Sequence, residues 1–432
     1  MIAADHRAPR PVPAGLTARG AVVVPPSKSV SHRYLNLALL ARQPISIERL
    51  LDADDIRHFR GALDALGFNL RANGDTLSIE PPAEGARGAE IHCGNAGTLY
   101  RFLTATLTVV PGSWVLDGSP RLRERPIRPL VDALRSLGAR IRYRGGEGRA
   151  PLEIEGGSLR GGETTLDAAE SSQYASALIM AGTCAPAPVR VRLEALSSSP
   201  YLELTVEALR EFGVEVGRDA SRTRYQVEPG LLRAPRRLTI EGDYSAATYP
   251  AVAALVTGGR VRLEGLRSES AQGDRAFFDL LEAAGARVEA TGAGIEIERA
   301  GKLRAIRADL RDMPDQVPTL AALAPFLDGT TEITGVRHLR IKESDRLAAM
   351  ASELGRAGVP VRELDDGLIV EGCWFEREPP ADPVVIDPHD DHRIAMALAL
   401  VGLRRPGIAI ADPEVVGKSY PNFWRDLSTL LS

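Results

Sequence analysis

The stretch ALDALGFNLRANGDTLSIE (residues 62–80) contains the pattern that decides the fold. Its first half repeats apolar residues at helical spacing, and a glycine follows where a helix can end in a left-handed conformation. Its second half alternates between apolar and polar residues, as a half-buried strand does. Four more stretches share the pattern: LVDALRSLGARIRYRGGEG (130–148), TVEALREFGVEVGRDASRTRYQVE (205–228), FFDLLEAAGARVEATGAGIEIE (277–298) and LAAMASELGRAGVPVRELDDGLIVEG (347–372).

The glycines that end these predicted helices are almost evenly spaced, at Gly67, Gly138, Gly213, Gly285 and Gly358. Any one pair of stretches is similar enough to arise by chance, but five copies at one interval indicate a repeat of about 70 residues. A sixth helix, NFWRDLSTLLS (422–432), ends the chain where the next copy is due, without its hairpin. Apolar segments such as SQYASALIMAGT and AATYPAVAALVTGG supply a second helix in each copy. The sequence predicts about six α/β units with mixed strand pairing, and three plus three is the natural division by size.

Composition narrows the classes of function. The chain has 432 residues, 44% of them hydrophobic and 25% charged, and a formal net charge of −4, which does not favour a nucleic-acid partner. The first residues resemble no secretory signal, and no apolar run reaches the ~18 residues of a membrane-spanning helix. Isolated Cys93, Cys184 and Cys373 form no zinc motif. We expect a soluble, cytoplasmic protein without a zinc site.

Lysine is rare in this chain. Four of the 53 basic residues are lysines, and arginine fills the other positions. Lysine offers a compact charge that can release its proton, so the few that remain are candidates for function. Lys302 lies in a polar stretch typical of a surface, whereas Lys28, Lys342 and Lys418 lie within the motifs described next.

Five motifs of the first half are suited to binding anions. They are VPPSKSVSHR (24–33), CGNAGTLYRF (93–102), SPRLRERPIRPL (119–130), AAESSQYASAL (168–178) and SSSPYLELT (197–205). Each places hydroxyls, glycines or cations near a predicted helix start, where backbone amides favour negative charge. Each is also compatible with an ordinary cap, tight loop or solvated basic turn.

Three motifs of the second half add titratable groups. DMPDQVPTLAALA (312–324) puts Asp315 before an apolar helix, where an N-cap role competes with that of a partly desolvated base. In LRIKESDRLAAM (339–350), Lys342 and Arg346 share a helix face if the helix has begun, with Glu343 pointing elsewhere. DPHDDHRIAMALAL (387–400) invites a metal site, but no further ligand cluster supports one.

Taken together, the motifs supply eight cations at strand-to-helix turns. These are Lys28, Arg33, Arg101, Arg125, Lys342, Arg346, Arg393 and, in VVGKSYPNFW (415–424), Lys418. That number fits substrates carrying phosphates and carboxylates. Neither a P-loop nor a dinucleotide-binding fingerprint is present.

The ordered motifs PSKSVSHR, GNAGT, RERPI, SSQ, KESDR, DDHRIAM and GKSYP resemble those of the 5-enolpyruvylshikimate-3-phosphate synthase family, over about residues 20–425. The resemblance implies two lobes, each of three βαβαββ units around a pseudo-threefold axis. Residues 1–25 and 242–432 would form one lobe and residues 26–241 the other, with the active site in the cleft between them. It also implies a role in aromatic amino acid biosynthesis and makes the chain a candidate target of glyphosate. The retained Gly97 favours sensitivity, and the departures described below leave that sensitivity open.

The resemblance assigns roles residue by residue. The catalytic residues would be Asp315 as base, Glu343 as acid, and Lys28. Shikimate 3-phosphate would be bound by Lys28, Ser29, Arg33, Ser171, Ser172, Gln173, Ser198, Tyr201, Asp315, His338 and Lys342. Phosphoenolpyruvate would be bound by Lys28, Asn95, Gly97, Arg125, Gln173, Arg346, Arg393 and Lys418. No cofactor is implied, and we expect a monomer acting on small molecules, with no nucleic-acid or membrane partner.

The sequence departs from the family at a few places. Other residues are common in the family at the positions of Pro26, Leu99, Tyr100, Phe102 and His338, and these positions bear on the shape of the phosphoenolpyruvate pocket. The alternative is a UDP-N-acetylglucosamine enolpyruvyl transferase, which shares the fold and the donor. That family usually has a Lys-Asn pair near its start and a cysteine on a mobile loop, and neither pattern is evident here.

Overall fold

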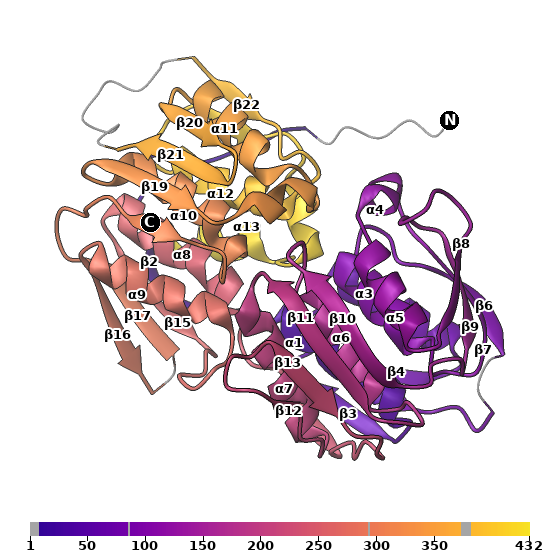
Figure 1. The fold of residues 1–432 in the computed structure, drawn as a ribbon. Helices are drawn as coiled ribbons and strands as arrows, with labels where there is room; N and C mark the ends of the chain where they lie inside the picture. Colours follow the sequence, from indigo (N-terminus) through magenta and orange to yellow (C-terminus); the bar gives the residue numbers. More distant parts are fainter. Residues whose placement is uncertain (1–7, 85–86, 293, 373–381) are drawn as a thin grey trace. The chain divides into compact units, whose positions relative to one another are not determined.

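A computed structural model describes residues 8–84, 87–292, 294–372 and 382–432 (Figure 1). Cys373 and the first seven residues, on which two of the expectations above fall, lie outside the described residues. The chain divides into two compact units. The split unit comprises Met1–Pro25 and Gly242–Ser432, and the continuous unit comprises Pro26–Glu241.

Within the described residues, the strands of the continuous unit form three four-stranded sheets. The first has the order β6 (Gly88–His92), β7 (Gly112–Asp117), β9 (Leu152–Gly156), β8 (Arg140–Tyr143). The second has the order β10 (Gly162–Ala168), β11 (Val189–Leu196), β13 (Arg224–Val227), β12 (Gly217–Arg218). The third has the order β14 (Arg237–Thr239), β3 (Ile45–Glu48), β5 (Thr76–Glu80), β4 (Asn69–Asn73).

The described residues of the split unit also form three sheets, of which one is shorter. The first four-stranded sheet has the order β16 (Ala286–Thr291), β17 (Gly294–Arg299), β15 (Arg260–Glu264), β2 (Arg19–Val23). The second has the order β18 (Arg307–Asp309), β19 (Thr330–Thr334), β21 (Gly367–Glu371), β20 (Val361–Leu364). The third has only β1 (Arg10–Pro11), β23 (Ile408–Ile410) and β22 (Val384–Ile386).

The predicted repeat is confirmed. In every sheet of the described residues one pair of strands is parallel, as β6 and β7 are. A single α-helix crosses between the two strands in four of these sheets, whereas the pairs β2–β15 and β3–β14 join segments that are far apart in the sequence. In the four-stranded sheets an antiparallel hairpin follows the second crossover helix, as β8 and β9 do. The last helix, α13 (Phe423–Leu430), has no hairpin after it, as expected, and β1 instead pairs antiparallel with β23.

The glycine-terminated helices of the repeat are the outer helices. They are α2 (Asp54–Ala65), α5 (Arg128–Ser136), α7 (Ser199–Glu211), α9 (Ala276–Ala283) and α11 (Arg346–Arg356). The five predicted glycines follow them, and all have φ between +77° and +106°. A residue with a side chain adopts that conformation only under strain, so the glycines fix where each helix turns back into its hairpin.

A second set of helices is buried in the core of each unit. In the split unit, α8 (Tyr244–Thr257), α10 (Val317–Leu323) and α12 (His392–Gly402) contact one another, and every residue in them is buried. In the continuous unit, α1 (Lys28–Ala41), α3 (Gly97–Thr106) and α6 (Gln173–Gly182) are mostly buried. A helix that is apolar all round belongs in such a core, and its ends are then the places where polar groups can emerge. No described helix is both long and apolar enough to cross a membrane.

Candidate active site

In the split unit, one buried arginine gathers three carboxylates. Arg346 is the first residue of α11, whose N-cap Asp345 accepts a hydrogen bond from the amide of Ala348. Its guanidinium donates to Asp391 at 2.7 Å, Asp315 at 2.8 Å and Glu343 at 2.9 Å. Burial alone would lower the pKa of Arg346, but the three carboxylates together raise it, so the arginine stays charged.

Arg393, at the start of α12, completes a second set of contacts. Its Nη2 donates to Asp315 at 2.6 Å, and its Nη1 donates to Ser245 Oγ at 2.7 Å. Asp315 lies in a 3-10 turn, η2 (Pro314–Gln316), and its two oxygens therefore bridge Arg346 and Arg393. Two guanidinium groups favour the deprotonated carboxylate, the form that a general base requires.

Glu343, like Asp315, contacts two cations. One of its oxygens accepts from Arg346, and the other lies 3.6 Å from Nζ of Lys418, at the end of η6 (Pro413–Lys418). The Asp391 side chain is fully buried, whereas those of Asp315 and Glu343 are 25% and 10% exposed. Asp391 accepts from the amide of Arg393 as the N-cap of α12 and is therefore structural, while Asp315 and Glu343 reach solvent and can meet a ligand.

One expectation about this motif is wrong. Lys342 and Arg346 do not share a helix face, because α11 begins at Arg346 and Lys342 precedes it in an extended conformation. Asp345 caps the helix, and a cap stops the helix from extending backwards to Lys342. Glu343 also does not point away from Arg346 but binds it.

His338 lies near the same group of charges, in η4 (Arg337–Ile341). Burial, followed by the positive charge of Lys342, lowers the pKa of His338 to about 3. Its ring is therefore neutral near pH 7 and can serve as a hydrogen-bonding group, not as a cation.

In the continuous unit, Arg33 of α1 is a buried cation whose partners are neutral. Its Nε donates to Thr205 Oγ1 at 2.8 Å, and its other nitrogens donate to the carbonyls of Ser29 and Tyr201. Burial lowers the pKa of Arg33 to about 10, which leaves it charged at neutral pH. Within the described residues no carboxylate pairs with it. A buried charge without a counter-charge is costly, and an anionic ligand would supply one.

Lys28, the first residue of α1, contacts a carboxylate of the same unit. Its Nζ lies 3.4 Å from Asp55, which is buried in α2. Ser27 caps α1 by accepting from the amide of Val30. The contact with Asp55 orients the lysine at the amino end of the helix, where anions are favoured.

The two predicted serine clusters lie at neighbouring strand ends. β10 and β11 are parallel, and their last residues, Ala168 and Leu196, are paired. Ser171 and Ser172 follow the first strand, and Ser198 follows the second, all three buried. Ser198 has φ +57°, a left-handed conformation that is unusual for a residue with a side chain. The structure thus brings together hydroxyls that are 26 or more positions apart in the sequence.

Gln173 and Arg125 connect this edge to α3. The amide oxygen of Gln173 accepts from Arg101 at 2.7 Å, and its nitrogen donates to Thr98 at 2.9 Å. The guanidinium of Arg125 lies against the first residue of α3, because a Cβ added to Gly97 would come within 2.6 Å of its Cζ. Asn95 lies two residues before Gly97, in the turn that leads into α3.

Burial distinguishes Arg125 from the other arginines of its motif. Arg121 pairs with Glu124, Arg123 with Asp117, and Arg128 with Asp132, and these three arginine side chains are at least 33% exposed. Arg125 is only 4% exposed. The motif of residues 119–130 therefore contains one buried arginine and three exposed arginines in ion pairs. Ion pairs of exposed arginines contribute little to stability. Lys302 is likewise at the surface, 56% exposed and paired with Asp328, as predicted.

Of the residues that depart from the family pattern, Phe102 has the clearest consequence. It is fully buried, and its ring centroid lies 5.6 Å from Cζ of Arg33. A cation over an aromatic face is stabilised, so Phe102 helps to hold the guanidinium of Arg33. Leu99 and Tyr100 are buried in α3.

Sequence reasoning missed several residues that hold these groups in place. They are Asp55, Thr205, Ser245, Tyr249, Asp274 and Gln316, with Asp391 considered only as a metal ligand. Asp391 carried a signal, because an aspartate directly before an apolar helix is a typical N-cap. The others had none, since their partners are distant in the sequence.

A groove elsewhere in the continuous unit has a volume of about 1150 Å³. Its walls include Arg128, Thr165, Arg192 and Arg224, and none of the predicted site residues lines it. Ion pairs such as that between Arg190 and Glu163 occupy its surface. It therefore gives no support to the predicted site.

Comparison with known proteins gives consistent results. Residues 14–427 match the family model for EPSP synthase (3-phosphoshikimate 1-carboxyvinyltransferase). A 3-phosphoshikimate 1-carboxyvinyltransferase of Syntrophobacter fumaroxidans is 43% identical over 95% of this chain and 96% of its own length. The corresponding protein of Methanoculleus marisnigri is 41% identical over 93% and 94%. The solved EPSP synthase of Acinetobacter baumannii is similar in fold, with a TM-score of 0.80 and 27% identity over 98% of each chain.

Proposed function

This chain belongs to the EPSP synthase (3-phosphoshikimate 1-carboxyvinyltransferase) family, and we propose that it transfers the enolpyruvyl group of phosphoenolpyruvate to the 5-hydroxyl of shikimate 3-phosphate. The products are the enolpyruvyl ether and phosphate, on the route to chorismate and the aromatic amino acids. The observation that carries the proposal is the pair of carboxylates, Asp315 and Glu343, each held by two cations and each open to solvent.

The cations of the split unit support binding of phosphoenolpyruvate. Arg346, Arg393 and Lys418 are all more than 90% buried, and they are balanced by Asp315, Glu343 and Asp391. A phosphate or carboxylate can replace Asp315 or Glu343 as their partner, which frees the displaced carboxylate to act on a proton. We assign Arg125, Gly97, Asn95 and Gln173 of the continuous unit to the same substrate.

The hydroxyls and cations of the continuous unit suit shikimate 3-phosphate. Arg33 and Ser29 would hold its carboxylate, since Arg33 is a buried cation with neutral partners. Ser171, Ser172 and Ser198 would hold its phosphate at the ends of β10 and β11. Tyr201, Gln173, Lys28 and, from the split unit, His338 and Lys342 complete this assignment.

The proposed reaction is an addition followed by an elimination. Glu343 takes up a proton once phosphoenolpyruvate has replaced it as the partner of Arg346 and Lys418. It delivers that proton to the methylene carbon of phosphoenolpyruvate, which leaves its C2 cationic. The 5-hydroxyl oxygen attacks C2 as Asp315 accepts the hydroxyl proton, which gives a tetrahedral ketal. The bond between C2 and the phosphate oxygen then breaks, phosphate leaves, and the methyl carbon returns a proton to restore the double bond. The arginines and Lys28 stabilise the charge that develops on the departing phosphate.

We further propose that the protein works as a cytoplasmic monomer without nucleic-acid or membrane partners. The formal net charge of −4 supports the proposal that nucleic acid is not a partner, because binding to nucleic acid depends on positive charge.

Phosphate release, measured with both substrates and with each omitted in turn, tests the proposed function. We expect release only when both are present, and a loss of at least about 100-fold in the Asp315→Asn variant, the scale of a general base. The matched control is Asp279→Asn, an exposed position of α9, which should match the wild type. Release without shikimate 3-phosphate, or normal turnover in Asp315→Asn, would contradict the proposal.

A further inference from the structure

Asp274 is a buried carboxyl group to which the reaction gives no role. It lies in η1 (Gly273–Arg275), is 3% exposed, and accepts a hydrogen bond from Gln316 Nε2 at 2.9 Å. The turn is fixed from the neighbouring residue, because Gln272 donates to the carbonyl of Gly242 and accepts from the amide of Tyr244. Asp274 thus occupies a rigid position beside the start of α8.

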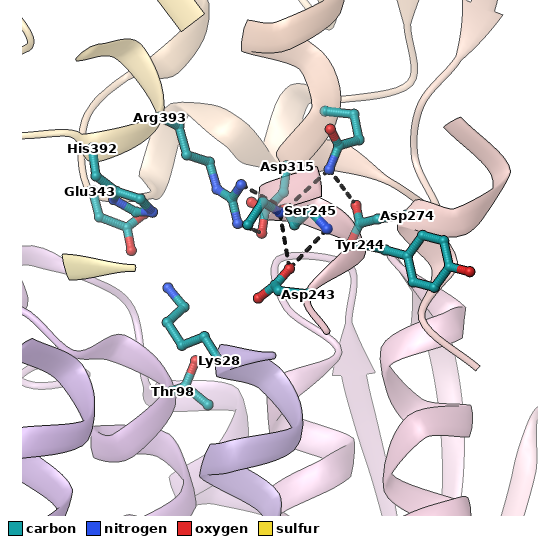
Figure 2. A network of polar contacts seen from close by, with 12 residues as sticks. Lys28, Thr98, Asp243, Tyr244, Ser245, Asp274, Asp315, Glu343, His392 and Arg393 are labelled. Carbon is teal, nitrogen blue, oxygen red and sulfur yellow. Dashed lines mark hydrogen bonds and ion pairs between the residues drawn. The ribbon is translucent and has the colours of Figure 1, made fainter. Parts of the chain in front are cut away.

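Three polar contacts lead from Asp274 to the anion-binding arginine through two intermediate residues (Figure 2). Gln316 Nε2 also donates to Ser245 Oγ at 3.0 Å, and Ser245 Oγ accepts from Arg393 at 2.7 Å. Arg393 in turn holds Asp315 at 2.6 Å. Gln316 and Ser245 are fully or almost fully buried, so no bulk water competes for these contacts.

The charges around Asp274 suit it to change protonation near neutral pH. Burial and the nearby charge of Asp315 raise the pKa of Asp274 to about 7, against the effects of Gln316 and Arg393. Asp243, the N-cap of α8, raises it further. The other titratable groups packed nearby are bonded elsewhere: the Tyr244 hydroxyl donates to the carbonyl of Arg267, and the Arg275 guanidinium donates to the carbonyl of Ser268.

We infer that Asp274 is a positioning residue for Arg393, which it holds through Gln316 and Ser245. When Asp274 loses its proton, its negative charge weakens the attraction of Arg393 for an anionic substrate. When Asp274 gains a proton, that attraction is restored. The inference rests on the proposed function, in which Arg393 binds phosphoenolpyruvate.

Gln316 is suited to transmit this change. Its Oε1 is buried, and no described residue bonds to it. With Asp274 charged, the amide nitrogen donates to both Asp274 and Ser245, as observed. With Asp274 protonated, a half-turn of the amide places its oxygen there to accept from Asp274 and from the Ser245 hydroxyl. Both lone pairs of Ser245 are then left to the guanidinium of Arg393.

The test is the KM for phosphoenolpyruvate of Asp274→Asn and of the wild type between pH 6 and pH 8.5. Asparagine is neutral and keeps the shape of the protonated side chain. The ratio of the two KM values cancels the ionisation of the substrate itself. We expect the KM of Asp274→Asn divided by that of the wild type to be near 1 at pH 6. This ratio should fall to about one-fifth at pH 8.5, because Asp274 of the wild type is then negatively charged. The kcat should stay within twofold of the wild type.

Asp279→Asn serves as the control, since it makes the same change at an exposed position of the same unit and should give a ratio near 1 at every pH. A second variant, Gln316→Met, removes the amide that connects Asp274 to Ser245 and leaves the Asp274 and Arg393 side chains unchanged. We expect it to raise the KM about fivefold with kcat within twofold.

Three results would overturn the inference: a ratio that does not change with pH, the same drift in Asp279→Asn, or an unaltered KM in Gln316→Met. Failure of the proposed function is distinguishable, because it appears as normal turnover in Asp315→Asn whatever Asp274→Asn does. If Asp274→Asn does not fold, Gln316→Met alone decides the question.

Discussion

Single residues show two ways in which this protein accommodates buried charge. Arg346 is neutralised by the three carboxylates that surround it, and Asp315 and Glu343 each bridge two cations. Arg33, by contrast, has only neutral partners. We interpret the first arrangement as a site in which the substrate displaces a carboxylate, and the second as a site in which the substrate supplies the missing charge.

Replacement of Glu343 by glutamine tests its role as an acid. The variant keeps the shape of the side chain but carries no transferable proton. We expect kcat to fall at least about 100-fold, the usual contribution of an acid–base group, with KM changed less than tenfold. Steady-state phosphate release measures both constants. Glu371→Gln, at an exposed end of β21, is the matched control and should leave both unchanged; a Glu343→Gln variant with normal kcat would exclude Glu343 as the acid.

At this scale, sequence could identify the residues that carry charge but not the ones that position them. Glu343 and Arg346 stand out in the sequence because they crowd one short motif. Ser245 and Gln316 do not stand out, because they act through contacts between distant residues. Ser245 contacts Arg393, 148 positions away, and Gln316 contacts Ser245, 71 positions away. No local pattern records such a contact.

At the scale of secondary-structure elements, the site residues gather at helix starts. The inner helices have no exposed face, so their first turns are where polar groups can emerge from the core. Lys28 begins α1, Gly97 begins α3, Gln173 begins α6 and His392 begins α12. Unsatisfied amides at these ends favour anions, which fits two acidic substrates.

Gly97→Ala tests the close contact at the start of α3. The new methyl group would lie 2.6 Å from the guanidinium of Arg125, which must then move. We expect the KM for phosphoenolpyruvate to rise about tenfold, because small displacements of a binding group are costly. Gly61→Ala in α2 is the control, since its methyl group meets nothing within 4 Å.

Gly61→Ala should leave KM unchanged and stabilise the protein by about 1 kcal/mol in urea unfolding, as alanine does inside an exposed helix. Equal KM values for Gly97→Ala and the wild type would show that Arg125 does not act from this position.

Element boundaries show where local reasoning succeeds and where it fails. The five helix-ending glycines were predictable because each is dictated by one backbone conformation. The start of α11 was left open by the spacing of Lys342 and Arg346, although Asp345 carried a cap signal. Where the two signals compete, the cap decides, since it satisfies backbone amides that otherwise remain unbonded.

At the scale of the whole molecule, the repeat is completed by distant segments. The third sheet of the continuous unit takes its first strand, β14, from residues about 190 positions after β3. The last sheet of the split unit takes β1 from the other end of the chain. The number of units was therefore predictable from the periodicity, whereas the pairing of β14 and of β1 was not.

The stability of the split unit should depend on the protonation of Asp274. Its pKa is raised from 3.8 to about 7 by burial, so the folded state binds a proton that the unfolded state releases near pH 4. Stability from this group is complete below pH 4 and is lost as pH rises to about 7, by about 4 kcal/mol in total. Asp274→Asn does not titrate and avoids this loss.

Urea unfolding at pH 5 and pH 8 measures the effect. The unfolding free energy of Asp274→Asn minus that of the wild type should be larger at pH 8 than at pH 5. The titrations of all other groups are common to both proteins and cancel in this difference. A difference in unfolding free energy that is the same at both pH values would show that Asp274 does not titrate in this range.

The most direct test of the central claim, that an acid in this site protonates phosphoenolpyruvate and so activates it for attack, is turnover in D₂O. We predict that the methylene group of the enolpyruvyl product acquires deuterium, as seen by NMR or mass spectrometry, because the carbon passes through a methyl group that received its hydron from a solvent-exchangeable side chain. A product whose methylene group contains no deuterium would contradict the account.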